Sequence, residues 1–203
     1  RFFFITGEPG IGKTAVAARL TQIRGLDAHH FCIARQASTI DPLLFTRSLS
    51  CQLTRIDGFA HGILKNSSVK VEAQQNIQRL QGQAINLQIK NLVVNASSAN
   101  NAFNCTVAEP LRNLYKDGFK QQLVILVDAL DEAVEFQGRE TIVDLLANAR
   151  DLPSQVRFLL TSRPHGEATR HFERLEIPHL VLNAECGENL QDIRRYISFK
   201  LDE

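Results

Sequence analysis

The chain has 203 residues, a formal net charge of +1 and 44% hydrophobic residues, enough for one domain whose core needs neither disulfides nor metals. Its basic and acidic residues are interleaved, so nothing indicates a nucleic-acid-binding surface, and no run of about 18 apolar residues is present that would span a membrane. The four cysteines lie far apart and form no Cys-x-x-Cys pair, a pattern that favours reduced thiols and predicts a cytoplasmic protein.

The first predicted elements are a buried strand over residues 2–6, a glycine-rich loop, and a helix from residue 12 to about residue 23. The loop reads Gly-Glu-Pro-Gly-Ile-Gly-Lys-Thr and matches the phosphate-loop pattern. Glycines let the backbone approach a ligand closely, and the N–H groups at the start of a helix bind phosphate. Lys13 is predicted to contact the β- and γ-phosphates. The predicted nucleotide-binding residues are Gly7, Glu8, Pro9, Gly10, Ile11, Gly12, Lys13, Thr14 and Ala15.

A second strand is predicted over residues 30–34, where His-Phe-Cys-Ile-Ala forms a short apolar segment. Asp41 and Pro42 predict the start of a helix, because Asp is a good cap and Pro is tolerated at the first helical position. The spacing of the leucines that follow is typical of a helix reaching about residue 56.

Residues 57–118 are rich in glutamine and asparagine and predict an insertion in the main fold. Ser97 or Ser98 is expected to cap a helix that is broken or kinked near Pro110 and ends at Gly118. A small β-hairpin is predicted upstream from two alternating segments, one with Val69 and Val71 and one with Ile85, Leu87 and Ile89.

The most apolar run, residues 123–127, predicts a strand covered on both faces and ends at Asp128. A helix over residues 141–150, strands over 156–161 and 179–182, and a final helix with Leu190, Ile193 and Ile197 follow. Strands alternating with helices predict an α/β fold with a doubly wound, mainly parallel sheet and flanking helices. Ligands bind at the carboxyl ends of such strands, where residues 7–14, 128–132 and 162–163 are expected to converge.

The polar residues expected at that edge suit the chemistry of a bound triphosphate. Asp128 and Thr14 would hold Mg²⁺, which prefers hard oxygen ligands and keeps several waters. Asp131 or Glu132 would orient or deprotonate a water for attack on the γ-phosphate, and the sequence does not separate the two. Arg163 is a permanent cation that would contact the γ-phosphate. We therefore predict Asp131, Glu132 and Arg163 as catalytic residues.

Three segments together resemble the signatures of the STAND class of P-loop NTPases. They are residues 7–14, residues 123–132 (Leu-Val-Ile-Leu-Val-Asp-Ala-Leu-Asp-Glu) and residues 158–164 (Phe-Leu-Leu-Thr-Ser-Arg-Pro). The Asp-Glu pair after the strand and the Thr-Ser-Arg-Pro sequence are most similar to the NACHT branch, with the NB-ARC/AP-ATPase branch second. The resemblance covers most of the chain except about residues 57–96.

This resemblance implies a molecular switch domain of a signalling or defence regulator, which binds ATP or ADP with Mg²⁺ and hydrolyses ATP slowly. Such proteins self-associate through the NTPase domain when activated, and their effector and sensor domains lie outside it. Because the chain contains no methionine and its first strand begins at residue 2, we expect residues 1–203 to be an excerpt of a longer multidomain protein.

Two alternatives stay open from the sequence. A small-molecule kinase would need an acceptor pocket and a group of lid arginines, and only Arg170 and Arg174 follow Arg163 loosely. A scaffold that binds nucleotide without turnover would not need Asp131 and Glu132. A GTPase is disfavoured, since residues 161–164 stand where guanine-binding proteins place Lys and Asp.

Overall fold

A five-stranded parallel sheet forms the centre of the fold, with the strands in the order β2-β5-β6-β1-β7. The computed structural model describes residues 1–23, 25–64, 69–72, 91–94, 98–149, 151–164, 166–172, 177–183 and 191. The strands of the sheet are β1 (Phe2–Gly7), β2 (Ala28–Phe31), β5 (Leu123–Asp128), β6 (Val156–Ser162) and β7 (His179–Leu182). The predicted α/β fold with a parallel sheet is confirmed.

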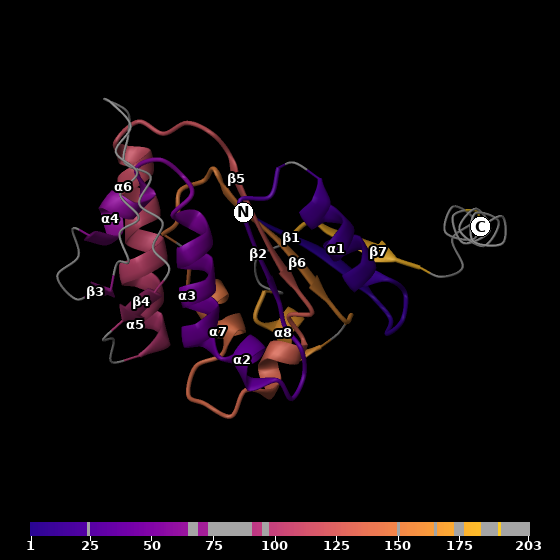
Figure 1. Ribbon diagram of the computed structural model, residues 1–203. Coiled ribbons are helices and arrows are strands. Elements are labelled where there is room, and N and C mark those ends of the chain that lie inside the picture. The colour runs from indigo at the N-terminus through magenta and orange to yellow at the C-terminus, as the bar shows by residue number, and fades with distance from the viewer. Residues whose placement is uncertain are drawn as a thin grey trace, which may run out of the picture.

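Helices cover both faces of this sheet (Figure 1). The chain passes from β1 to β2 in one direction along the sheet and from β2 through β5 and β6 to β7 in the other. Since such crossovers are right-handed, the reversal places α1 on one face and the later helices on the opposite face. The helices are α1 (Lys13–Gln22), α2 (Ala37–Ile40), α3 (Pro42–Leu53), α4 (Phe59–Leu64), α5 (Ala99–Phe103), η1 (Asn104–Ala108), α6 (Glu109–Lys116), η2 (Glu132–Glu135), α7 (Ile142–Asn148) and α8 (Glu167–Arg170).

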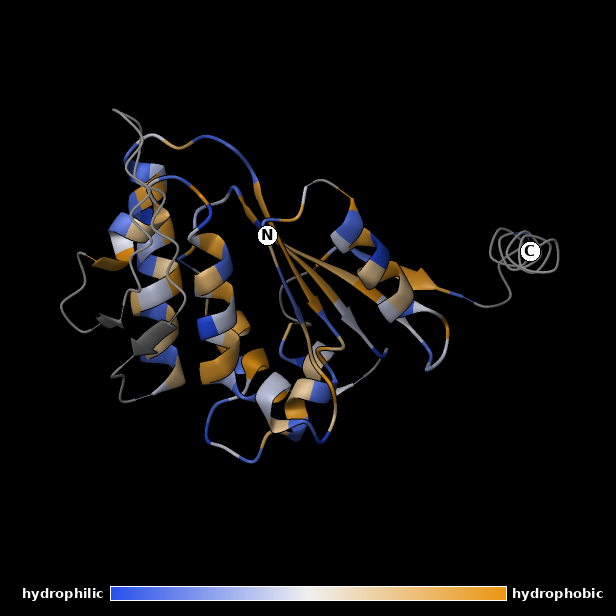
Figure 2. Cartoon of the chain, viewed as in Figure 1, coloured by the Kyte–Doolittle hydropathy of each residue, from blue (hydrophilic) through white to orange (hydrophobic). Residues whose placement is uncertain are grey.

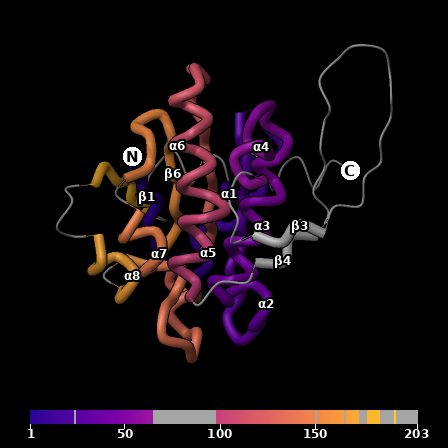
Figure 3. Tube along the Cα trace, turned by 90° about the vertical axis from the view of Figure 1, so that its left-hand side faces the viewer, coloured from indigo at the N-terminus to yellow at the C-terminus, as the bar shows by residue number. Residues whose placement is uncertain are grey.

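The apolar residues of the strands and of the later helices form one core. Figure 2 shows most strands of the sheet as largely hydrophobic, whereas β2 is more hydrophilic. β5 is buried over nearly its whole length because the sheet has helices on both faces. Beside the sheet, α3, α4, η1 and α6 pack against one another, and Figure 3 shows α5 and α6 in front of the strands from that side. We name α3, α4, η1 and α6 the helical layer.

The predicted helix starts are confirmed by their caps. The Asp41 carboxylate accepts hydrogen bonds from the N–H groups of Leu43 and Leu44 at the start of α3. Ser98, one of the two serines considered, caps α5. Thr141 and Asp144 form a capping box at α7, which satisfies two backbone N–H groups that the helix itself leaves unpaired.

The insertion differs in detail from its prediction. β3 (Val69–Glu72) pairs antiparallel with β4 (Asn91–Val94), so the described partner strand begins after the alternating residues 85–90, which lie outside the described residues. α4 was not predicted. Near Pro110, where a break or kink was expected, a π-helical segment, η1, joins α5 to α6, and Pro110 lies in the first turn of α6.

Two smaller differences lie at the edges of the sheet. β2 begins at Ala28 and ends at Phe31, two to three residues before the prediction, because its register is set by pairing of residues 28–31 with residues 125–128 of β5. The predicted final helix lies outside the described residues except for Gln191. None of the helices in the described part of the chain has the length and apolar character needed to cross a bilayer.

Candidate functional site

The loop between β1 and α1 has a backbone that only glycine accommodates easily. Gly10 and Gly12 have φ angles of +81° and +101°, in the region that L-residues with a Cβ rarely adopt. A Cβ on Gly7 would lie 2.8 Å from Cγ2 of Ile11 and 3.0 Å from the carbonyl oxygen of Leu182. The glycines at these three positions therefore allow the loop to turn tightly at the end of β1.

The start of α1 lacks the side-chain cap that α3, α5 and α7 have. Its N-cap residue is Gly12, and its first turn contains no acidic residue. The first-turn N–H groups of a helix have no partner within the helix and carry a partial positive charge. Thr14 and Ala15 are exposed at this point. The start of α1 is therefore an open group of hydrogen-bond donors suited to an anion.

The ammonium group of Lys13 lies against the backbone of its own loop. Its Nζ donates to the carbonyl oxygen of Gly7 over 2.6 Å and to that of Glu8 over 3.0 Å. These carbonyls lie on the same loop as the glycines, so the cation lies where the loop and the helix start meet. Lys13 is thereby held beside the donors of α1, in a position from which it can reach a bound anion.

Asp128, at the carboxyl end of β5, is a buried carboxylate with a hydroxyl partner. Its side chain is only 1% exposed, and its Oδ1 accepts a hydrogen bond of 2.5 Å from Oγ1 of Thr161 on β6. The same Thr161 hydroxyl accepts 2.8 Å from the N–H of Ala129, whose φ is +54°. Among the described residues, no lysine, arginine or histidine forms an ion pair with Asp128.

The two carboxylates that follow Asp128 contact different parts of the molecule. Asp131 receives the backbone N–H of Arg163 at Oδ1 over 3.1 Å and the guanidinium Nε at Oδ2 over 3.0 Å. Glu132 accepts from the N–H of Ala34, after β2, at Oε2 over 2.5 Å. The sequence placed both residues near Asp128 but did not indicate either partner.

Cys32 also lies beside these carboxylates, and sequence reasoning missed it. It is 3% exposed, and its N–H donates to the carbonyl oxygen of Asp128 over 3.1 Å. Burial raises the pKa of the Cys32 thiol strongly, and the negative charges of Asp128, Glu132 and Asp131 raise it further. The predicted strand over residues 30–34 placed Cys32 within a strand, whereas β2 ends one residue before it and puts it at the site.

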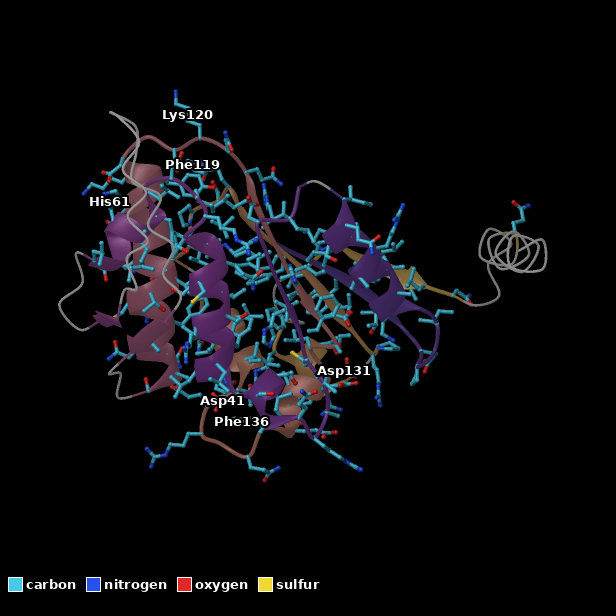
Figure 4. The ribbon with its side chains drawn as sticks, viewed as in Figure 1. Asp41, His61, Phe119, Lys120, Asp131 and Phe136 are labelled. Carbon is cyan, nitrogen blue, oxygen red and sulfur yellow. The ribbon has the colours of Figure 1, made fainter. Side chains whose placement is uncertain are left out.

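The sheet brings the three predicted segments to one edge. Thr6 of β1 lies opposite Ser162 of β6, and Val127 of β5 lies opposite Leu160. β6 thus separates the strands that lead to the glycine loop and to Asp128, which are about 10 Å apart at roughly 4.8 Å per strand. Figure 4 shows Asp131 at this end of the strands, opposite to Lys120. The glycine loop, the carboxylates and Arg163 all follow the carboxyl ends of strands at this edge.

The profile of a family described as nephrocystin 3, N-terminal, matches residues 1–163. The chain belongs to this family. No curated protein matches the chain. The part that matches the nephrocystin 3 N-terminal family contains every predicted site residue, from Gly7 to Arg163. The family description itself names no ligand and no reaction.

Two further observations in this nephrocystin 3 N-terminal chain concern metal ligands and the surface beside Arg163. In the described part of the chain, no group of three or more His, Cys, Asp and Glu side chains is arranged to hold a metal ion by itself. A depression of about 390 Å³ lies beside Arg163, and no residue of the glycine loop lines it. Its lining residues come from η2, the end of β6 and α8, and are Asp131, Val134, Glu135, Arg163, Pro164, Gly166 and Glu167.

Proposed function

We propose that the chain is a nucleotide-binding domain of the STAND class of P-loop NTPases, closest to the NACHT branch, which binds ATP or ADP with Mg²⁺ and hydrolyses ATP slowly. One observation carries this proposal: an uncapped, glycine-walled helix start lies at the same sheet edge as the buried carboxylate of Asp128. The helix start would attract a polyphosphate, and the buried carboxylate of Asp128 would be stabilised by a cation.

The residues present fit the phosphates of a nucleotide. The first-turn N–H groups of α1 have no side-chain cap, and the Lys13 ammonium is held by the carbonyl of Gly7 in the loop just before them. A phosphate offers stronger acceptors than the carbonyl oxygens of Gly7 and Glu8, because it is charged. Lys13 would therefore exchange those carbonyls for the β- and γ-phosphates when a nucleotide binds.

The residues also fit Mg²⁺ as a partner of the nucleotide. A buried carboxylate is normally paired with a cation or coordinates a metal, whereas in the described part of the chain the hydroxyl of Thr161 is the one hydrogen-bond donor to the side chain of Asp128. Asp128 and Thr14 would hold the ion together with phosphate oxygens and waters, so no cluster of three protein ligands is required. Bound Mg²⁺ would neutralise charge on the β- and γ-phosphate oxygens.

Slow turnover agrees with the contacts of the two candidate bases. Asp131 is engaged by two N–H groups of Arg163, and Glu132 by one N–H group of Ala34. To accept a proton from water, either carboxylate would have to turn an oxygen toward that water, and its contacts with these N–H groups oppose such a turn. Self-association on activation, and effector and sensor domains outside residues 1–203, follow from the resemblance and are part of the proposal.

A nucleotide-binding scaffold without turnover is the second candidate. It is favoured by the same contacts, because neither Asp131 nor Glu132 has both carboxylate oxygens uncommitted. This alternative shares the binding residues with the first and differs only in the absence of hydrolysis.

The test is calorimetric titration with ATP and ADP in the presence of Mg²⁺. Lys13→Ala should weaken nucleotide binding at least about a hundredfold, since it removes the phosphate-binding cation. Lys120→Ala is the matched control, because Lys120 is exposed at the opposite end of the molecule (Figure 4) and should leave the affinity unchanged. Equal affinities of wild type and Lys13→Ala would contradict the proposal. Measuring phosphate release by the wild type then distinguishes a switch domain that hydrolyses ATP from a scaffold that binds nucleotide without turnover.

A further inference from the structure

We propose that Asp131 is a positioning residue for Arg163 and that, through Arg163, it sets the preference of the site for a nucleoside triphosphate over a diphosphate. This inference rests on the proposed function and assigns a role that the sequence left shared between Asp131 and Glu132. It starts from the observation that both oxygens of one carboxylate contact the same arginine.

The two contacts fix different parts of Arg163. Oδ1 of Asp131 accepts from the backbone N–H over 3.1 Å, which does not depend on how the side chain turns. Oδ2 accepts from Nε over 3.0 Å, which sets the direction of the side chain up to the guanidinium group. Asp131 itself is held firmly, since its side chain is only 13% exposed. A half-buried carboxylate thus orients a more exposed arginine.

This arrangement leaves the outer edge of the guanidinium for another anion. A guanidinium group has five N–H donors, and the Nε edge and the edge formed by the two terminal nitrogens can each face a different acceptor. In the described part of the chain, no hydrogen bond from the terminal nitrogens of Arg163 is recorded, and its side chain is 55% exposed. A γ-phosphate at the end of β6 would therefore meet donors whose direction is already set.

The contacts of Asp131 also make it a poor candidate for the general base. A base must turn an oxygen toward the water that it deprotonates, and both oxygens of Asp131 face Arg163. Glu132 differs, because only its Oε2 has a recorded partner in the described part, the N–H of Ala34. The geometry leaves Glu132 as the residue that can address the water.

The depression beside Arg163 supplies a matched control. Glu135 lines it together with Asp131 and Arg163, but Glu135 is exposed and forms no ion pair with Arg163 in the described part of the chain. Glu135→Gln therefore removes the same negative charge from the same neighbourhood without removing the contact. Comparing Glu135→Gln with Asp131→Asn therefore distinguishes the loss of a negative charge from the loss of the contact that orients Arg163.

The experiment is a double-mutant cycle on the whole chain, with Asp131→Asn, Arg163→Ala and their combination. The readout is the ratio of ADP to ATP dissociation constants with Mg²⁺, measured by calorimetry. Asp131→Asn should lower the preference for ATP about three- to tenfold, the size expected when one long side chain loses its fixed direction. The same change should have no further effect in the Arg163→Ala background, and Glu135→Gln should have none in the wild type.

Arg163→Lys gives a second route if Asp131→Asn unfolds the chain, which circular dichroism would reveal. Lysine keeps the charge but has no Nε edge, so the preference for ATP should fall as in Asp131→Asn. An unchanged preference in Asp131→Asn or Arg163→Lys would overturn the inference. So would a further loss of hydrolysis when Asp131→Asn is added to Arg163→Ala, because an effect that does not need Arg163 would make Asp131 the base. If the wild type binds neither nucleotide, the proposed function fails, and the inference fails with it.

Discussion

The helical layer and the carboxyl edge of the sheet satisfy their polar groups in different ways. In the layer, the hydroxyl of Ser50 on α3 donates to the carbonyl oxygen of Thr106 on η1 over 2.7 Å, and both residues are fully buried. At the edge, two contacts involve a charged side chain that is partly exposed, those of Lys13 with its loop and of Arg163 with Asp131. A ligand can replace contacts of the second kind but has no access to the first. Changes in the layer should therefore alter stability, and changes at the edge should alter binding.

The largest expected effect is that of Phe45→Ala in the helical layer. Phe45 on α3 is 0% exposed, and its ring packs edge-on against His30 of β2 with centroids 5.0 Å apart. Removing the ring leaves a cavity that the surrounding helices cannot fill, so the free energy of unfolding should fall by about 3–5 kcal/mol. Chemical denaturation measures this loss, and the nucleotide affinity of the folded fraction should not change.

The control for this prediction lies on the same helix. Leu44 on α3 is 40% exposed, and Leu44→Ala should change the free energy of unfolding by only about 0.5 kcal/mol. A cost for Phe45→Ala no larger than that of Leu44→Ala would mean that the layer does not carry the stability that its burial indicates.

A smaller effect on stability, accompanied by one on binding, is expected for Thr161→Val at the edge. The Thr161 hydroxyl donates to Asp128 and accepts from the N–H of Ala129. Valine has nearly the same shape but leaves both groups without this partner in a buried place, which should cost about 2–3 kcal/mol of unfolding free energy. Since Asp128 also loses its fixed orientation, Mg²⁺-dependent nucleotide binding should weaken.

Thr46→Val tests whether that double effect belongs to the edge. Thr46 is equally buried, but its hydroxyl only donates to the carbonyl oxygen of Pro42 within α3. Its replacement should cost about 1 kcal/mol or less and leave nucleotide binding unchanged. The comparison between the two regions breaks down if Thr46→Val weakens nucleotide binding as much as Thr161→Val does.

Most of the fold was accessible from the sequence because its signals are local. The continuous apolar run before Asp128 predicts a buried strand, and Asp41 followed by Pro42 predicts a helix start, without any knowledge of distant residues. α4 was missed because it is only six residues long and contains Gly62, which disfavours a helix. Gly62 is explained only by the fold, since a Cβ there would lie 2.9 Å from Cα of Pro110 on α6.

The placement of the predicted site residues at one edge of the sheet could be predicted from the sequence, but their contacts could not. Parallel strands bring their carboxyl ends to one edge, so the placement of Asp128 and Arg163 at the same edge as the glycine loop follows from strand order. The ion pair of Asp131 with Arg163 joins residues 32 positions apart, and the contact of Glu132 with Ala34 joins residues 98 positions apart. Such pairings depend on register and on the turn after β5, where Ala129 has a positive φ that its residue type does not indicate.

The smallest expected effect concerns His30, where the sheet meets the helical layer. His30 is 8% exposed, and burial lowers the pKa of its imidazole, which outweighs the opposite effect of the hydrogen bond to Thr39. Because that bond goes to a carbonyl oxygen, Nε2 of the ring carries the proton. As the pH falls through the usual pKa of 6.5, the unfolded chain binds more protons than the folded one, so the free energy of unfolding falls.

His30→Gln should therefore flatten the pH dependence of stability between about pH 7.5 and about pH 5.5, with a difference of about 1 kcal/mol or less from the wild type. Chemical denaturation at the two pH values measures it. His61→Gln is the control, because His61 is exposed on α4 and should leave the slope as it is. Since His30 packs on Phe45 of the layer, its replacement should alter this slope and leave nucleotide affinity unchanged. If His30→Gln changed the nucleotide affinity but not the pH dependence of stability, His30 would act on the carboxyl edge instead. The connection would be the loop after β2, where the N–H of Ala34 donates to Glu132.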